Sequence, residues 1–403
     1  MTAILPRSIT SVARDRCESG RITHQTMSDQ TPTFNFLVFP YRDQYFLDTY
    51  GCIVRDLQII ESLRRHPQVR GLTVVNRPVH VLERVLRRRV LSHRQSGESE
   101  GLRYWDRTSY SPSAPFIWDE WKRRCYGPYL EMIRQFAGFD PAARNVLLDF
   151  NPIAIFDYDA FSDYLKWYDL IDNFEKHNRY SPWQKARVAE KYRYVSEHAD
   201  LITGVTDAAL ARFPAGKKVT LHNKLLDRAR PHAATPDFLY GFTGFVTDKF
   251  DVDFIRSLAT GGEERVAIYG EVLDSAIGEA LSAIPGVKLF GRFRQADTAR
   301  IHATFAVGLI PYRRDRSHDE SPLKLYSYLD HGRPVVSLQD YEVESDYIHV
   351  VDRENLKALH EFVAHYTADL ARAPGETINA IRAEIGDRHS WHSALTGLFE
   401  TVL

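Results

Sequence analysis

The chain has 403 residues, in which 52 Lys plus Arg face 53 Asp plus Glu, so the formal net charge is -1. This length exceeds one ordinary core and predicts two domains, while the balanced charge excludes the global basic field that recruits nucleic acid. Cys17, Cys52 and Cys125 lack the spacing of a zinc site or a disulfide framework, which favours a reducing, cytoplasmic location. No apolar run approaches the roughly 20 residues that span a bilayer.

The first half of the chain alternates strand and helix patterns after a polar start. Residues 1–33 mix Arg, Ser, Thr and Asp without helical period and predict a disordered tail. Apolar strands are then predicted at 34–40, 72–78, 146–150, 153–161, 164–170, 200–206 and 219–223, and helices at 50–67, 185–199 and 207–213. Because such alternation is typical of a parallel sheet wrapped by helices, residues 34–223 predict one Rossmann-like α/β domain.

A linker and a second α/β domain follow. Residues 224–237 contain two prolines and little pattern, which predicts a linker. Strand patterns then recur at 240–246, 265–270, 287–293, 305–312 and 334–338 with helices between them, so residues 238–375 predict a second Rossmann-like domain. The final helices, 376–403, are expected to pack back on the first domain. Two such domains form a cleft between the carboxyl ends of their sheets, where this architecture binds ligands.

The second half contains a candidate anion site. The motifs GxGxxG after the first strand and GxxxxGK[ST], which bind phosphates in many proteins, do not occur in the sequence. Instead, Gly244, Gly270 and Gly291 end predicted strands, where glycine permits turns that approach a ligand closely. The run Ser321–Lys324 opens a predicted helix. Free N–H groups and a partial positive charge at a helix start attract anions such as phosphate.

Residues 290–337 resemble the donor-binding half of GT-B glycosyltransferases. Their sequence is FGRFRQADTARIHATFAVGLIPYRRDRSHDESPLKLYSYLDHGRPVVS, and the family has Gly-Arg, a helix, a strand ending in Leu-(Ile/Leu)-Pro-(Phe/Tyr), then Ser-Pro-x-Lys-x-x-Glu-Tyr-Leu-Ala-x-Gly-x-Pro-Val-Val. Shorter similarities extend over most of the chain, in WYDLIDNF, EHADLITGVTDAAL, VTLHN and YGFTGFVTDKFDVDFI. The resemblance implies the GT-B architecture of two facing Rossmann-like domains. It also implies transfer of a sugar from a nucleotide diphosphate sugar, with a UDP-sugar favoured, to a hydroxyl of a glycan or glycolipid. Such a reaction belongs to bacterial polysaccharide or glycoconjugate synthesis.

The resemblance implies a donor site in the second domain. Lys324 and the N–H groups after Ser321 would hold the diphosphate and stabilise the charge of the leaving nucleotide in place of a metal. Arg292 and Phe293 would flank the base, and Tyr312 would line the floor. For Phe293 and Tyr312, core packing is an equal alternative. The predicted donor site comprises Gly244, Phe245, Arg292, Phe293, Tyr312, Ser321, Pro322, Leu323, Lys324 and Ser327. The nucleotide diphosphate sugar is a co-substrate, and no cofactor or metal is expected.

One departure from the family pattern bears on stereochemistry. Much of the family, especially its retaining branch, has glutamate where this chain has Ser327, together with an acidic residue eight positions earlier, where Asp319 stands. We therefore expect a weaker ribose contact through Ser327, and retention of configuration is not favoured. Glu320 is a candidate to compensate for the missing carboxylate.

An inverting transfer needs a general base near the acceptor hydroxyl, and the first domain is expected to supply it. Asp172 is favoured, because it follows an apolar run and is expected at the carboxyl end of a strand; the alternative is that it caps the next helix. The further candidates are Asp169, Asp48, Asp56, Asp157 and Asp159. Tyr50, Gly51 and Arg55 are predicted to contact the acceptor, and His177, His222 and His331 are interpreted as structural or surface residues.

Other functions stay open at this point. FDYDAF, residues 156–161, joins an apolar run to Asp-x-Asp, the pattern with which GT-A transferases hold a divalent metal. A nucleotide-sugar epimerase of the same doubled fold, or a catalytically silent nucleotide-binding protein, would use the same cleft. The basic segment 82–94 is either a solvated helix face or a peripheral contact with the inner face of the membrane. The expected partners are a nucleotide-sugar donor and a glycan or lipid-linked acceptor, without nucleic acid.

Overall fold

The structure, a computed structural model, describes residues 32–86, 96–99, 101–112, 118–230, 235–260, 265–352 and 356–403. The chain divides into Met1–Pro32 and Thr33–Leu403, and all elements below belong to the second unit. Nearly all of the predicted tail and most of the basic segment 82–94 lie outside the described residues. None of the helices in the described ranges has the length and hydrophobicity needed to span a bilayer.

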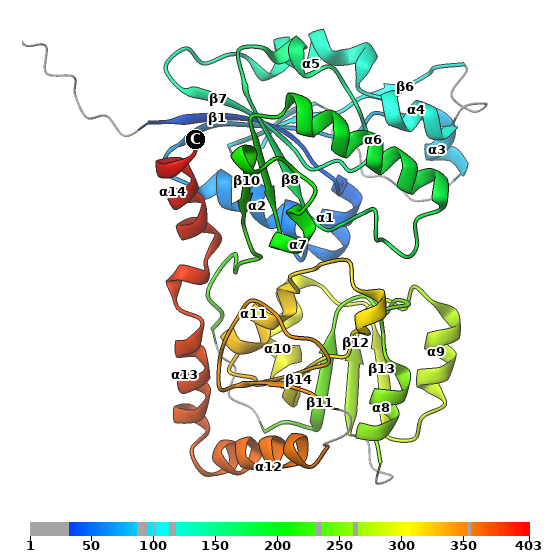
Figure 1. Cartoon of the computed structure of the whole chain (residues 1–403), viewed down its shortest axis with the longest axis vertical. Helices are drawn as coiled ribbons and strands as arrows, with labels where there is room; N and C mark the ends of the chain where they lie inside the picture. The colour runs from blue at the N-terminus through cyan, green and yellow to red at the C-terminus, as the bar shows by residue number, and fades with distance from the viewer. Residues whose placement is uncertain are drawn as a thin grey trace, which may run out of the picture. The chain divides into compact units, whose positions relative to one another are not determined.

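The first domain is built on an eight-stranded sheet in the order β10-β9-β8-β7-β1-β2-β5-β4 (Figure 1). Neighbouring strands run parallel, except β4 and β5. The strands are β1 (Phe34–Phe39), β2 (Val69–Val75), β4 (Gly97–Ser99), β5 (Leu102–Trp105), β7 (Arg144–Asp149), β8 (Leu165–Leu170), β9 (Leu201–Gly204) and β10 (Lys218–Thr220). A separate parallel pair joins β3 (Val79–His80) to β6 (Thr108–Ser109). The central strand β1 is buried along its whole length, as a parallel strand covered on both faces should be.

Seven helices accompany this sheet in the described ranges. They are α1 (Gln44–Tyr50), α2 (Arg55–Arg65), α3 (Val81–Leu86), α4 (Trp118–Arg124), α5 (Leu130–Ala137), α6 (Pro182–His198) and α7 (Asp207–Leu210). Thr206 caps α7, since its side chain accepts a hydrogen bond from the N–H of Ala209. Helix α6 begins with a capping box of Ser181 and Gln184. Helix α1, which no sequence pattern predicted, is capped by Asp43.

The second domain has a six-stranded parallel sheet in the order β13-β12-β11-β14-β15-β16. Its strands are β11 (Phe238–Thr243), β12 (Val266–Tyr269), β13 (Val287–Gly291), β14 (Phe305–Ile310), β15 (Val335–Ser337) and β16 (Ile348–Val350). Its helices are α8 (Val252–Leu258), α9 (Ser275–Ser282), α10 (Thr298–His302) and α11 (Leu323–Asp330). The strand order reverses between β11 and β14, which is the switch point where Rossmann-like sheets bind ligands. The predicted α/β fold class is confirmed.

The last three helices connect the two domains along one side of the structure (Figure 1). They are α12 (Leu356–Arg372), α13 (Pro374–Glu384) and α14 (Trp391–Thr401). Apolar residues of α12 and α13 belong to the core of the second domain. Trp391 and Phe399 of α14 belong instead to a core cluster of the first domain, with Phe34 and Phe36 of β1. The chain therefore ends on the first sheet, although α12 and α13 pack on the second.

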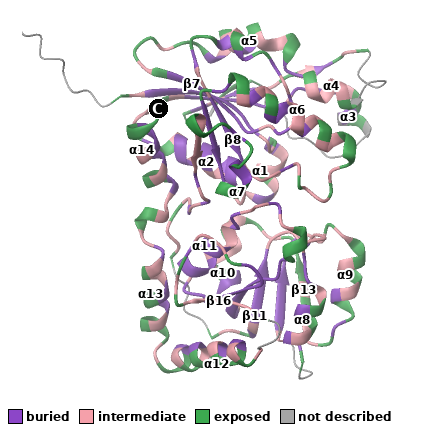
Figure 2. Ribbon diagram, in the orientation of Figure 1, coloured by how far each residue is buried: buried purple, intermediate pink, exposed green. Residues whose placement is uncertain are grey.

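Buried residues follow the two sheets (Figure 2). One predicted strand is wrong: residues 153–161 form a loop and a short 3₁₀ helix, Tyr158–Phe161. Phe156 and Phe161 are buried against Phe39 of β1. The apolar pattern of this segment therefore reflects core packing by a loop, which strand periodicity cannot distinguish from a short buried strand.

Candidate active site

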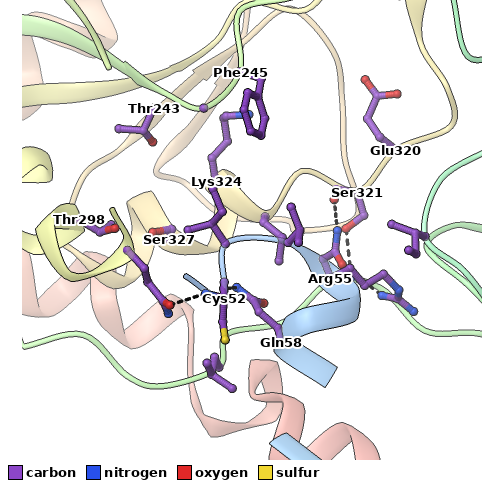
Figure 3. A pocket seen from close by; sticks show the side chains of 18 of the residues that line it. Cys52, Arg55, Gln58, Thr243, Phe245, Thr298, Glu320, Ser321, Lys324 and Ser327 are labelled. Carbon is purple, nitrogen blue, oxygen red and sulfur yellow. Dashed lines mark hydrogen bonds between the residues drawn. The ribbon is translucent and has the colours of Figure 1, made fainter. Parts of the chain in front are cut away.

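A cavity of about 540 Å³ lies between the carboxyl ends of the two sheets. The first domain lines it with the loops after β1 and β8, including Asp172, and with the start of α2. The second domain lines it with the turn after β11 and with the cleft-facing side of α11, including Gly244 and Lys324. Figure 3 shows the Lys324 side chain running from the start of α11 towards Phe245. Both domains thus contribute polar side chains to one cavity.

The amine of Lys324 occupies the centre of the second domain's contribution. Its Nζ donates to the hydroxyl of Tyr312 and lies 4.6 Å from the centroid of the Tyr312 ring and 4.9 Å from that of Phe242. Burial, together with the nearby positive charge of Lys249, lowers the pKa of Lys324 to about 7. A cation held among aromatic rings gains from the ring faces, but it lacks a full counter-charge. An anionic ligand would supply that charge.

The turn after β11 brings main chain against this lysine. Gly244 has φ 135°, in the region that favours glycine, and a Cβ placed there would lie 3.2 Å from Nζ of Lys324. Gly270, with φ 151°, lies behind it, and a Cβ on Gly270 would come within 1.8 Å of the carbonyl oxygen of Gly244. The two glycines are needed for this close approach of main chain to the amine. Gly291 also has a positive φ, 76°, at the end of β13.

The start of α11 is available to an anion. Pro322 is the N-cap residue, and no side chain among the described residues caps the helix, so its first N–H groups are free to bind a ligand. Ser321 is itself occupied: its hydroxyl donates to Glu342 and accepts from the N–H of Asn223, and its carbonyl accepts from the Asn223 side chain. We therefore assign Ser321 to fixing the helix start against the first domain. Leu323 and Ser327 line the cavity.

The two acidic residues before this helix have different environments. Glu320 lines the cavity and lies 3.3 Å from Nζ of Lys249. Burial raises the pKa of Glu320, but Lys249 and the main-chain N–H of His318 outweigh this and hold it below its ordinary value. Asp319, with φ 58°, is not among the residues that line the cavity; its carboxylate binds Asn173 and Lys176 of the first domain, each at 2.7 Å. Of these two residues, Glu320 is thus the one that lines the cavity.

The two favoured base candidates have opposite environments. Asp172 lies just after β8 and lines the cavity; one oxygen accepts from the N–H of Asn173 at 3.0 Å and the other lies 3.5 Å from Nδ1 of His318. It does not cap the next helix, which Ser181 caps. Asp169 is fully buried within β8.

Asp169 and Arg55 form a buried ion pair. Two guanidinium nitrogens of Arg55 donate to the two oxygens of Asp169 at 2.8 and 2.7 Å, and Thr203 donates a third hydrogen bond at 2.6 Å. A third guanidinium nitrogen donates to Asn223 at 3.1 Å. With its acceptor lone pairs engaged in this way, Asp169 does not present a free oxygen to an acceptor hydroxyl. The burial of Asp169 in this structural pair contradicts its predicted role as base. Arg55 also lines the cavity, so its contact with the acceptor stays a prediction.

Tyr50 and Gly51, at the end of α1, contact the second domain, whereas Cys52 and the residues after it in the same loop line the cavity. The hydroxyl of Tyr50 donates to Glu271, and burial followed by this hydrogen bond raises the pKa of Tyr50 to about 12. Gly51 has φ 81°, and a Cβ there would lie 2.9 Å from the Gln295 side chain. Glu271 also pairs with Arg292 at 2.7 Å. Tyr50 and Gly51 therefore contact the second domain, and Arg292 pairs within the second domain with the carboxylate that Tyr50 binds. None of the three is among the residues lining the cavity.

The remaining predicted residues lie along the cavity. Phe293, Phe245 and Tyr312 line it, and Phe245 also packs against Tyr50 with ring centroids 5.5 Å apart. Tyr312 is at once part of the apolar core of the second domain and part of the cavity wall, so both interpretations of it hold.

The other carboxylates and histidines that the sequence singled out have mostly local partners. Asp157 caps the 3₁₀ helix by accepting from the N–H of Asp159 at 2.9 Å, and Asp56 accepts from the N–H groups of Tyr41 and Arg42. No group of three or more His, Cys, Asp or Glu side chains that could hold a metal occurs within the described ranges. The ring of His222 contacts the carbonyl of Val205 at 2.8 Å and that of His331 the carbonyl of Ser327 at 2.7 Å. His177 and His331 nevertheless line the cavity.

Comparisons with protein-family models and with curated proteins found no match. Among solved structures, the chain is similar to sucrose-phosphate synthase from Thermosynechococcus elongatus, with a TM-score of 0.59 and 12% identity over 91% of this chain and 98% of that one. The chain has the GT-B fold. The lipopolysaccharide outer core galactosyltransferase WaaB gives a TM-score of 0.49 at 10% identity over 92% and 100% of the two chains. S. aureus TarM gives 0.48 at 13% identity over 64% of this chain, which spans only 55% of the TarM chain.

Three residues of this GT-B cleft were not predicted from the sequence. Lys249 contacts Glu320 and lies 4.9 Å from the centroid of the Tyr312 ring. Asn223 links Arg55 of the first domain to Ser321 of the second. His318 lies between Asp172 and His177. Each acts through a residue distant in sequence, so no local pattern marks it.

Proposed function

We propose that the protein is a glycosyltransferase that moves a sugar to a hydroxyl of a glycan or glycolipid. The favoured sugar is a hexose, and the donor is a UDP-sugar or another nucleotide diphosphate sugar. One observation carries the proposal: the half-buried amine of Lys324 lies at the glycine turn, in the same cavity as the carboxylate of Asp172. The first suits a diphosphate and the second suits an acceptor hydroxyl. The GT-B fold supports this proposal, because the chain shares it with a protein named sucrose-phosphate synthase.

The reaction follows from these positions. The acceptor oxygen attacks the anomeric carbon of the donor as the bond from that carbon to the diphosphate breaks, and the bonding pair stays on the diphosphate. Asp172 takes the proton from the acceptor hydroxyl. The ammonium of Lys324 and the first N–H groups of α11 stabilise the charge that grows on the leaving nucleotide. Because the attack comes from the face opposite the leaving group, the proposed transfer inverts the anomeric configuration, and no metal is required.

Thermal unfolding with nucleotides tests the donor site. UDP, GDP, ADP, CMP and TDP are added separately, each with and without EDTA. A ligand present at a hundred times its dissociation constant stabilises the fold by about 2.7 kcal/mol. We expect one nucleotide diphosphate, UDP first, to raise the melting temperature equally with and without EDTA. A shift that EDTA abolishes would indicate a metal-dependent site, and no shift with any nucleotide would contradict the proposal.

Two variants test the assigned roles. Lys324→Ala should remove the nucleotide-induced shift, whereas Lys357→Ala, on the exposed face of α12, should keep it. Asp172→Asn should abolish transfer to an acceptor but keep nucleotide binding. If transfer survives in Asp172→Asn, another group is the base or none is needed. Donor incubated without acceptor should stay unchanged; its conversion into an epimer would point to the epimerase function instead.

The acceptor is proposed to be a glycan or a lipid-linked glycan at the cytoplasmic face of a membrane. The basic segment 82–94, most of which lies outside the described residues, is the proposed membrane contact. Sedimentation with anionic liposomes at low salt, lost at high salt, would support this contact. Failure to sediment at low salt would argue for a soluble acceptor.

A further inference from the structure

A short segment of the second domain is held against the first domain beside Asp172. In the segment Arg316–Asp319, the carbonyl of His318 accepts from the N–H of Asn173 at 3.1 Å. The carbonyl of Arg316 accepts from the side chain of Asn178 at 3.1 Å, and the Asp319 carboxylate binds Asn173 and Lys176. The hydroxyl of Thr206 donates to the carbonyl of Asp319 at 2.8 Å. The position of this segment is therefore fixed by the first domain.

The ring of His318 has a defined proton position in this arrangement. Its Nε2 accepts a hydrogen bond from the main-chain N–H of Asn178 at 3.2 Å. An N–H group can only donate, so Nε2 must carry a lone pair and the ring proton must be on Nδ1. The ring is only 3% exposed and stacks on His177 with centroids 4.7 Å apart. Burial, followed by the neighbouring His318 and nearby cationic side chains such as Lys249, lowers the pKa of His177 to about 3, so this neighbour is neutral.

The protonated nitrogen of His318 faces the base. Nδ1 is buried and has no hydrogen-bond partner within the part of the chain that the structure describes. It lies 3.5 Å from one oxygen of Asp172. The other oxygen of Asp172 accepts from the N–H of Asn173. We propose that His318 is a positioning residue: from the donor domain it donates Nδ1–H to Asp172, and so holds the base oriented only while the two domains are docked. This inference rests on the proposed function, in which Asp172 is the base.

The arrangement has a chemical purpose in a transferase. A buried N–H donor stabilises the ionised form of a carboxylate and fixes which lone pair points into the cavity. Because His318 and Asp172 belong to different domains, the base gains this partner only when the donor site has closed over it. The charged and titratable groups that surround the pair from the neighbouring elements are His177, Arg179, Tyr192, Lys249, Tyr312 and Glu320.

The tautomer of His318 can be measured without an acceptor substrate. The full-length protein with ¹⁵N-labelled histidine is examined by long-range ¹H–¹⁵N NMR, and the His318→Gln variant identifies the His318 signals among the 16 histidines. We expect the pattern of a neutral ring protonated on Nδ1. A ring protonated on Nε2, or an imidazolium, at pH 7 would overturn the inference, whether or not the protein transfers sugar.

Two substitutions separate positioning from a merely structural role. His318→Asn keeps an N–H donor at the place of Nδ1 but loses the acceptor at Nε2, whereas His318→Gln keeps an acceptor for the N–H of Asn178 and loses the donor to Asp172. If His318 positions the base, His318→Gln should lower kcat/KM about tenfold or more and move the acidic limb of the pH–rate profile about one unit towards higher pH. His318→Asn should retain the wild-type limb. The reverse order, with Gln active and Asn impaired, would show that His318 only supports its own segment.

The outcomes separate this inference from the proposed function. If wild-type protein transfers sugar and Asp172→Asn does not, but both His318 variants have the wild-type pH profile, only the role of His318 is refuted. If Asp172→Asn transfers normally, the base assignment and the role of His318 fail together, while the glycosyltransferase proposal stands. If no nucleotide binds, the proposed function fails, and the NMR result alone then decides whether the Nδ1–H faces Asp172.

Discussion

Nucleotide binding should depend on pH through Lys324. In the ligand-free cleft its pKa is lowered to about 7, chiefly by burial and next by the charge of Lys249. A diphosphate prefers the ammonium to the amine, so binding should raise this pKa again. The sign follows directly: below pH 7 the lysine is already charged and binding needs no proton, whereas above pH 7 each molecule that binds must take up a proton.

The size of the effect follows from the titration of one group. At pH 7 about half of the lysine is charged, at pH 8 about 9% and at pH 9 about 1%. The dissociation constant of UDP should therefore rise by up to about fifty-fold between pH 7 and pH 9. The rise in the dissociation constant is limited by what the charged contact contributes to the binding free energy. That contribution is about 1.5–3 kcal/mol, or roughly 10- to 100-fold in affinity.

Isothermal titration calorimetry measures both quantities. Titrations at pH 8 in two buffers of different ionisation enthalpy should show uptake of close to one proton per UDP bound, since the terminal phosphate of UDP is already ionised there. Lys324→Arg, whose guanidinium stays charged throughout, should remove the proton uptake and flatten the profile. Lys324→Ala should bind weakly at every pH. Wild-type binding that is constant from pH 7 to 9 without proton uptake would refute the reasoning.

Three further substitutions test the framework of the site by denaturant unfolding. Gly270→Ala forces a Cβ to within 1.8 Å of the Gly244 carbonyl oxygen and should destabilise the fold by about 1–3 kcal/mol while weakening UDP binding. The control is Gly397→Ala, in the middle of α14 with no atom near its added Cβ, which should stabilise the fold by up to about 1 kcal/mol. Equal effects of the two substitutions would contradict the role given to Gly270. Asp169→Asn should cost about 3–5 kcal/mol because it leaves a buried guanidinium unpaired; unchanged stability with lost transfer would instead restore Asp169 as a base. Trp391→Ala should cost about 3–5 kcal/mol and should loosen the first domain first, which hydrogen exchange on β1 would detect.

The fold class could be predicted from the sequence because each domain repeats a strong local signal. Apolar strands such as 34–40 and 305–312 are separated by helices with polar faces, and the only common solution is a parallel sheet. The strand prediction for residues 153–161 was wrong because buried loops and short strands have the same apolar composition. The structure shows that this segment packs in the core, because Phe156 and Phe161 contact the ring of Phe39 on β1.

The site was predictable where it depends on local sequence and unpredictable where it depends on distant partners. The glycine turn at Gly244 and the helix start at Lys324 are local features, and the structure brings them together. Asp169 and Asp172 look alike in sequence, being three residues apart around the end of one strand. One faces a buried arginine and the other the cavity, a difference that depends on which side of the sheet α2 covers. His318 has no sequence signal, because its partners belong to the other domain.

Opening of the cleft should be inexpensive in free energy compared with unfolding. The contacts between the domains at the rim include hydrogen bonds and half-exposed ion pairs, such as Tyr50–Glu271 and Lys176–Asp319, and a few ring contacts. Each contributes about 0–1.5 kcal/mol. The apolar clusters lie instead within the individual domains and under α14, so separating the rims leaves them intact. In the proposed mechanism, a donor would enter an open cleft. Closure would then exclude water and bring His318 to Asp172 in one step, which would couple the orientation of the proposed base to a filled donor site.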